Sequence, residues 1–151
     1  MSDDILTAVE YSRDYLQSPL DDLYSFYYTM QWAAVFHDQD LPAKDVPIKL
    51  KRLREKLLGT QDNRSFATTL ITAPSSLSPI EYGSVLADCQ PVLRAWGLKL
   101  QSLKEDWKKC QSELQRQETK AKIYIPLFST FALRGVATLA ELVYKNTKDM
   151  D

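Results

Sequence analysis

Few side chains in this sequence are of the types that perform covalent chemistry. The chain contains one histidine, His37, and two cysteines, Cys89 and Cys110. A catalytic cysteine requires a base within hydrogen-bonding distance, and no feature of the sequence brings His37 close to either thiol. His37 follows an aromatic segment with helical character, and a cation is favoured at the negative end of a helix. We therefore interpret His37 as a helix-end residue and expect no catalytic residues.

The motifs that hold metals, nucleotides or phosphates are also missing from the sequence. There is no HExxH, CxxC, GxSxG, GxGxxG or GxxxxGK[ST] motif. Asp38, Asp40 and Asp45 resemble part of a calcium loop, but its glycine and closing glutamate are absent. We therefore expect no metal and no cofactor. An enzyme of an unfamiliar type stays an alternative, and it would need a polar cluster in a cleft.

Composition indicates one globular domain that spans residues 1–151. Apolar residues make up 44% of the chain and charged residues 26%, with a net charge of -1. These values are ordinary for a globular protein. The net charge does not predict that the protein binds a polyanion over its whole surface. Cys89 and Cys110 are separated along helical sequence by about 30 Å, too far for a disulfide. Free thiols and an acidic start without a signal sequence favour a cytoplasmic protein.

Helix signals occur along most of the chain, which predicts an all-α bundle of five or six helices. Pro19, Pro47 and Pro79 each stand where a helix can begin, and Ser78 with Glu81 can form a capping box. The aromatic helix is uncharged from residue 23 to 36, which is typical of a central, buried helix. The expected helices are 3–17, 19–37, 47–58, a segment from 79 that kinks or restarts at Pro91, a long helix at about 92–119, and 123–146, followed by a polar tail to 151.

The segment 60–77 is the exception to the helical pattern. We expect a long irregular connection there, in the form of a short helix capped by Asn63 or a strand-like crossing from Phe66 to Ile71. The segment is uncharged after Ser65. It is therefore interpreted either as a connection packed over the core or as a mobile binding loop.

Apolar residues recur along the long helix at alternating steps of three and four, which is heptad spacing. Because dimeric coiled coils favour Ile, Val and Leu at such positions, two tryptophans favour packing within the chain over self-association. A homodimer through the seam 93–121 stays the alternative. The seam residues are Leu93, Trp96, Leu100, Leu103, Trp107, Cys110 and Leu114.

The last helix is apolar enough to raise the question of a membrane span. Arg134 falls near its middle, where a charge costs roughly 2.5–3.5 kcal/mol on insertion scales. We therefore expect a docking helix and no transmembrane span. Its expected inner face consists of Phe128, Phe131, Ala132, Gly135, Leu139, Leu142 and Val143.

The basic helix 47–58 is the strongest functional signal in the sequence. Its outer face is cationic, relieved only by Glu55, so it suits an anionic partner. We expect a non-enzymatic interaction module of the adaptor, regulatory or inhibitor type, which binds another, acidic protein through this helix and the distal part of the long helix. The alternatives are a solvated surface without a partner, or a binder of nucleic acid backbone or lipid headgroups. The predicted partner-binding residues are Lys49, Arg52, Arg54, Lys56, Arg116 and Lys120.

Overall fold

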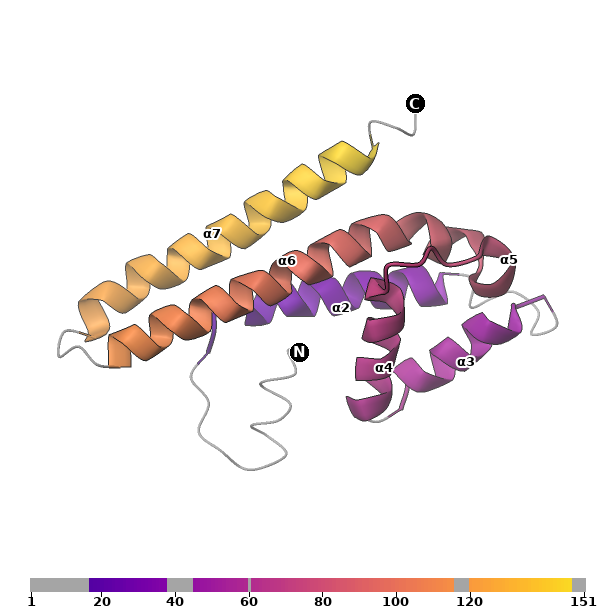
Figure 1. Ribbon diagram of the computed structural model, residues 1–151, viewed down its shortest axis with the longest axis horizontal. Coiled ribbons are helices and arrows are strands. Elements are labelled where there is room, and N and C mark those ends of the chain that lie inside the picture. Colours follow the sequence, from indigo (N-terminus) through magenta and orange to yellow (C-terminus); the bar gives the residue numbers. More distant parts are fainter. Residues whose placement is uncertain (1–16, 38–44, 60, 116–119, 148–151) are drawn as a thin grey trace. The chain divides into compact units, whose positions relative to one another are not determined.

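The computed structural model describes residues 17–37, 45–59, 61–115 and 120–147 (Figure 1). Within these ranges every regular element is a helix, so the predicted all-α architecture is confirmed. The predicted helix 3–17, Asp38, Asp40, Arg116 and the end of the polar tail lie outside the described residues. The helices are α2 (Asp21–Phe36), α3 (Ile48–Leu57), α4 (Gln61–Thr72), α5 (Pro79–Tyr82), α6 (Ser84–Gln115) and α7 (Lys120–Thr147).

The chain divides into two compact units. Unit 2 is Tyr27–Ala95, and unit 1 combines the chain up to Phe26 with the chain from Trp96 onward. The boundaries therefore fall within α2 and α6. The single domain expected from composition stays a prediction.

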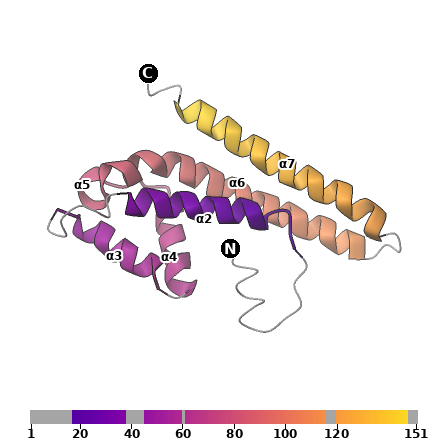
Figure 2. The ribbon, with the colours of Figure 1, turned by 180° about the vertical axis from the view of Figure 1, so that it is seen from behind.

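In unit 2, α3 packs through the leucine stripe that its sequence predicts. Leu50, Leu53 and Leu57 are buried, and α3 lies beside α4 (Figure 2). Ala67 and Ile71, four residues apart on α4, are fully buried. The i, i+4 spacing places both on one face of the helix, and this face carries α4 into the core.

The helix α4 occupies most of the segment 60–77, for which we expected an irregular connection. Among the described residues of this segment, the irregular part runs from Ala73 to Leu77. The hydroxyl of Thr72 donates to the carbonyl of Thr68 at 2.8 Å, so this threonine is accommodated within the helix. Of the two forms that the sequence left open, the short helix is confirmed. The strand-like crossing is wrong, because burial of one helical face outweighed the β propensity of the threonines and Ile71. Asn63 is not the cap, since the helix begins at Gln61.

The irregular connection is held by a buried side chain, that of Gln90 on α6. Its Nε2 donates to the carbonyls of Ile71 at 3.3 Å and Ser75 at 2.9 Å, and its Oε1 accepts from the N–H of Leu77 at 2.7 Å. The Ile71 carbonyl belongs to the last turn of α4, where carbonyls have no partner within the helix. Arg94, one turn further along α6, donates to the carbonyl of Pro74 at 3.1 Å. Gln90 thus ends α4 and fixes the chain that leads to α5.

Helix α6 begins earlier than expected and runs through Pro91 without restarting. The break lies at Gly83, whose φ of 82° is a left-handed conformation that favours glycine. The predicted capping box does not form, because Ser78 is the N-cap of α5 without a side-chain hydrogen bond. The carboxylate of Glu81 instead pairs with Lys49 at 2.6 Å.

In unit 1, the tryptophan seam of α6 packs against its own chain. Trp107 is 4% exposed and makes edge contacts with Tyr124, Phe128 and Phe131 of α7, with ring centroids 5.3–6.4 Å apart. Such aromatic pairs contribute roughly 0.5–1.5 kcal/mol beyond burial. The other seam residues from Leu93 to Leu103 are also buried. This part of the seam is therefore filled within the monomer, and a homodimer through the rest of 93–121 stays a prediction.

Helix α7 approaches α2 closely at a glycine. A Cβ at Gly135 would overlap Cδ1 of Leu23. Phe131 and Gly135 are buried, as the predicted inner face requires, while Val143 at its end is 41% exposed. Among the described residues, Ile123–Asn146 is long and apolar enough to cross a membrane by length and composition alone, and 11% of the residues in its most apolar stretch are buried.

Helix α2 is only partly buried, although its uncharged sequence predicts a central helix. Tyr27 and Val35 lie in the core, but Phe26 is 63% and Trp32 43% exposed. Trp32 stacks on Phe36 at 4.3 Å between ring centroids. The prediction failed because the aromatic residues pair along the helix surface and not only with neighbouring helices.

Replacing Gln90 tests its role in holding the connection. We expect Gln90→Leu to lower the free energy of unfolding by about 2–4 kcal/mol, because two buried backbone groups and one part-buried carbonyl lose their partner. Denaturant titration measures this loss. Gln101→Leu, at an exposed position of the same helix, serves as the control and should stay within about 0.5 kcal/mol. Equal effects of both changes would refute the role of Gln90.

Replacing Gly135 tests the close approach of α7 and α2. In an exposed helix, Gly→Ala stabilises by about 1 kcal/mol. We expect Gly135→Ala to destabilise instead, by about 1–3 kcal/mol, because the new methyl group overlaps Leu23. Thermal unfolding distinguishes stabilisation from destabilisation. A raised unfolding temperature would show that the Leu23 side chain shifts to make room for the new methyl group.

The buried hydroxyl of Tyr27 makes stability depend on alkaline pH. Burial raises the pKa of Tyr27 from 10.0 to about 12, against a smaller lowering by the nearby side chain of Gln31. Above pH 10 the unfolded chain releases this proton while the folded chain keeps it, so the free energy of unfolding falls as pH rises toward 12. Below pH 10 the contribution of Tyr27 to the free energy of unfolding is fully present. Between pH 10 and pH 12 this free energy falls by about 2–3 kcal/mol. Tyr27→Phe should reduce this slope, measured by denaturation at several pH values. The pKa of Tyr124 is also raised by burial, so part of the slope should remain. An unchanged slope in Tyr27→Phe would contradict the assignment.

Candidate functional site

The cations of α3 are divided between two sides of the helix. Lys49, Arg52 and Lys56, at positions i, i+3 and i+7, line one side. Arg54 points to the other side, where its Nε donates to the carbonyl of Val35 at 2.7 Å and its guanidinium lies 5.6 Å from the centre of the Phe36 ring. Arg54 therefore binds the last turn of α2, and we leave it out of the candidate site.

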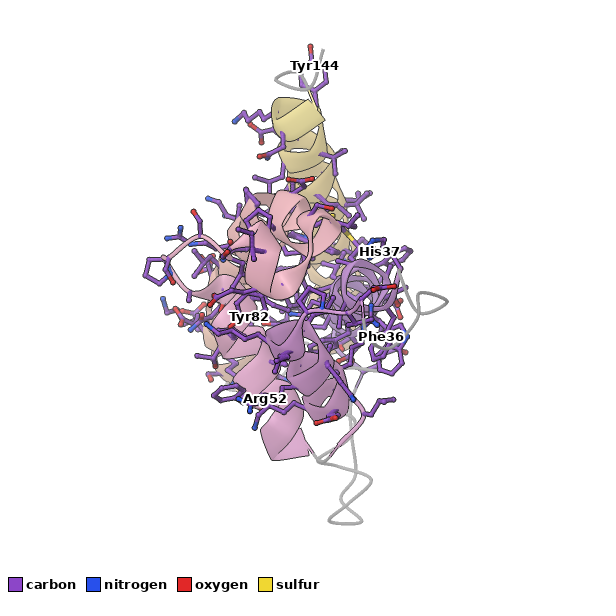
Figure 3. The ribbon with its side chains drawn as sticks, turned by 90° about the vertical axis from the view of Figure 1, so that its right-hand side faces the viewer. Phe36, His37, Arg52, Tyr82 and Tyr144 are labelled. Atoms are coloured by element: carbon purple, nitrogen blue, oxygen red, sulfur yellow. The ribbon has the colours of Figure 1, made fainter. Side chains whose placement is uncertain are left out.

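The three cations border a cavity of about 310 Å³ between α3, α4 and α5, which we name the basic pocket. In Figure 3, Arg52 and Tyr82 lie on one side of unit 2, and Phe36 and His37 lie on the other. The lining residues are Lys49, Arg52, Leu53 and Lys56 of α3, Phe66 and Leu70 of α4, and Tyr82 of α5.

The inner part of the basic pocket is apolar. Leu53 is buried, Leu70 is half-buried, and Phe66 is 53% exposed. The ammonium group of Lys56 lies 4.4 Å from the centre of the Phe66 ring, within the range of a cation–π interaction. The pocket thus combines an aliphatic and aromatic inner surface with a cationic rim.

Two of the rim cations differ in their availability. Lys49 is engaged by Glu81, and the hydrogen bond to this carboxylate raises the pKa of Lys49. Lys49 also lies 5.8 Å from the centre of the Tyr82 ring. Arg52 is exposed, and within the described part of the chain it has no ion pair. A planar guanidinium in this state can bind a carboxylate with two parallel hydrogen bonds.

The sequence predicted the cationic side of this site and missed the apolar side. Lys49, Arg52 and Lys56 are brought together, whereas the side chain of Lys120 lies outside the described residues, as does Arg116. Phe66 and Leu70 were missed because the sequence left open whether their segment is a short helix or a strand-like crossing. Their i, i+4 spacing was the available signal. Tyr82 reaches the site through the short helix α5.

The other candidate groups do not line the basic pocket. Cys89 and Cys110 are free and half-buried, and burial, aided by the charge of Asp88, raises the pKa of Cys89 and disfavours its thiolate. His37 is exposed directly after the last residue of α2. The described residues contain no group of three or more His, Cys, Asp or Glu side chains that could hold a metal ion.

In comparisons with protein-family models, curated proteins and solved structures, nothing matches the chain.

Proposed function

We propose that this protein is a non-enzymatic interaction module that binds an acidic segment of another protein in the basic pocket. One observation carries the proposal: three cations at i, i+3 and i+7 of α3 border an apolar cavity lined by Phe66 and Leu70. An adaptor, regulatory or inhibitor role in the cytoplasm is the biological setting that we propose for this binding.

The size and lining of the cavity favour a side-chain anchor. Its volume of about 310 Å³ is at the lower end of the range for ligand pockets, roughly 300–1,000 Å³. A phenylalanine, leucine or isoleucine of the partner would bury apolar surface against Leu53, Leu70 and Phe66. Binding energy at interfaces concentrates in such desolvated anchors.

The cationic rim would select the residues that flank the anchor. Carboxylates of the partner would pair with Arg52 and Lys56, while Lys49 is already paired with Glu81. Charges at the rim of an interface mainly raise the association rate and exclude like-charged partners. The partner would therefore carry acidic residues on both sides of its anchor.

The alternative partner is an anionic surface, namely nucleic acid backbone or lipid headgroups. The observation that favours it is the row of cations along one side of α3. Such binding would depend on charge alone and would weaken steeply with salt, by about 0.9 in log affinity per neutralised phosphate for each tenfold rise. The apolar lining adds nothing to it, and we therefore favour the protein partner.

Selection of random peptides tests the proposed function without knowledge of the partner. Peptides displayed on phage would be selected on the wild-type protein and depleted on Arg52→Glu. We expect a consensus with acidic residues on both sides of one large apolar residue. Binders that lack an apolar residue, or the absence of enrichment, would contradict the proposed function.

The affinities of the selected peptides provide the quantitative test. We expect Arg52→Glu to weaken binding by roughly tenfold or more, about 1.4 kcal/mol. Lys51→Glu makes the same charge change at an exposed position of α3 that does not line the pocket, so it should weaken binding by much less. Phe66→Ser should weaken binding without changing its dependence on salt. Fluorescence anisotropy at two salt concentrations measures all three variants, and equal losses for Arg52→Glu and Lys51→Glu would favour the anionic surface.

A further inference from the structure

One face of helix α7 is apolar and yet exposed to solvent. Its inner face, with Phe131 and Gly135, is buried, and a second face carries Arg134, Glu141 and Lys145. The third face is apolar and exposed. We name it the α7 strip, and it consists of Ile125, Ser129, Leu133, Val136, Ala137, Ala140, Val143 and Tyr144.

The large side chains of the α7 strip are exposed to an unusual degree. Ile125 and Leu133 are both 70% exposed, Val136 57%, and Tyr144 60%, and Tyr144 projects away from α7 in Figure 3. A contiguous apolar patch of this kind marks an interaction surface on a protein. At 1.5 Å per residue the strip extends about 30 Å along the helix.

The spacing within the α7 strip is that of a helix pair. Ser129, Leu133, Val136, Ala140 and Val143 follow one another at steps of four and three, the heptad pattern of a seam between two helices. No charged side chain interrupts this seam. The strip therefore suits another helix better than an irregular chain.

Lys120 and Lys122 precede the strip, and along the strip itself the charges of α7 do not favour an anionic membrane as the partner. Arg134 lies 3.7 Å from Asp106, and Glu141 lies 2.7 Å from Lys145. These charged side chains are thus matched within the chain, and they lie off the strip. Helices that bind membrane surfaces instead carry an excess of Lys and Arg on the polar face.

We propose that the α7 strip binds the same strip of a second copy of this chain, with the two helices antiparallel. The order of large and small residues carries this inference. When the twofold axis lies between Val136 and Ala137, Leu133 faces Ala140, Val136 faces Ala137, and Tyr144 faces Ser129. Each of these three layers pairs a large residue with a small one, which is the self-complementarity that a twofold interface requires.

The extent of the strip predicts a weak and reversible dimer. A strip about 30 Å long on a helix about 10 Å wide covers roughly 300 Å². A standard interface buries about 800 Å² per partner. The dimer should therefore dissociate on dilution. The strip is separate from the basic pocket in sequence, so loss of dimerisation and loss of peptide binding are independent outcomes.

Sedimentation analysis of the full chain over a range of concentrations is the first test. We expect the mass to rise from 17.3 kDa toward twice that value. Leu133→Glu with Val136→Glu should weaken association by at least tenfold, because both carboxylates enter the seam. Lys145→Glu, which adds a carboxylate to the charged face of the same helix, is the control and should leave association unchanged. Circular dichroism of each variant verifies that the helices are retained.

Disulfide trapping tests the direction of the two helices. In a background with Cys89→Ser and Cys110→Ser, we expect Leu133→Cys with Ala140→Cys to form a covalent dimer on oxidation, and Leu133→Cys alone to form none. A disulfide requires α-carbons within about 7 Å, and in the antiparallel arrangement the two 133 positions lie about 10 Å apart along the helix. A dimer trapped by Leu133→Cys alone would overturn the antiparallel arrangement.

The behaviour with lipid vesicles separates self-association from membrane binding. Vesicles of phosphatidylcholine, with and without phosphatidylserine, are the probe in a co-sedimentation experiment. We expect the wild-type protein to remain in the supernatant. A chain that is monomeric at all concentrations would overturn the proposal, and so would one that sediments with vesicles through the α7 strip.

Discussion

The hydrogen bonds of Gln90 are the constraint on which unit 2 depends. One amide satisfies the carbonyl of Ile71 at the end of α4, and the carbonyl of Ser75 and the N–H of Leu77 in the irregular connection that follows. Buried backbone groups that lack partners are costly. Without this side chain, the end of α4 and the approach to α5 would need water at groups that the core now covers.

The basic pocket follows from that constraint. With α4 held in place, Phe66 and Leu70 lie opposite the cationic side of α3, and α5 adds Tyr82. The pairing of Glu81 with Lys49 links α5 to α3, while Arg54 links α3 to α2. The same basic sequence therefore provides one residue for stability and leaves Arg52 and Lys56 at the rim for recognition.

Unit 1 relies on a different interaction, the packing of aromatic rings around Trp107. Tyr124, Phe128 and Phe131 surround its edge, and the missing side chain of Gly135 lets α7 approach Leu23. Only one face of α7 takes part in this packing. The large apolar side chains of the α7 strip stay exposed, and their heptad order suits a second helix.

Sequence periodicity alone predicts the helical class, the leucine stripe of α3, the buried tryptophan seam and the docking face of α7, because each depends on a pattern that a single helix carries. The packed structure was needed to choose the helix over the strand at 61–72, to show that α2 is only partly buried, and to bring Phe66 and Tyr82 to the cations of α3. Those outcomes depend on contacts between residues distant in sequence. Helical periodicity shows which face of a helix is apolar, but tertiary packing decides which element covers that face. In α4, burial outweighed the local β propensity of Ile71 and the threonines.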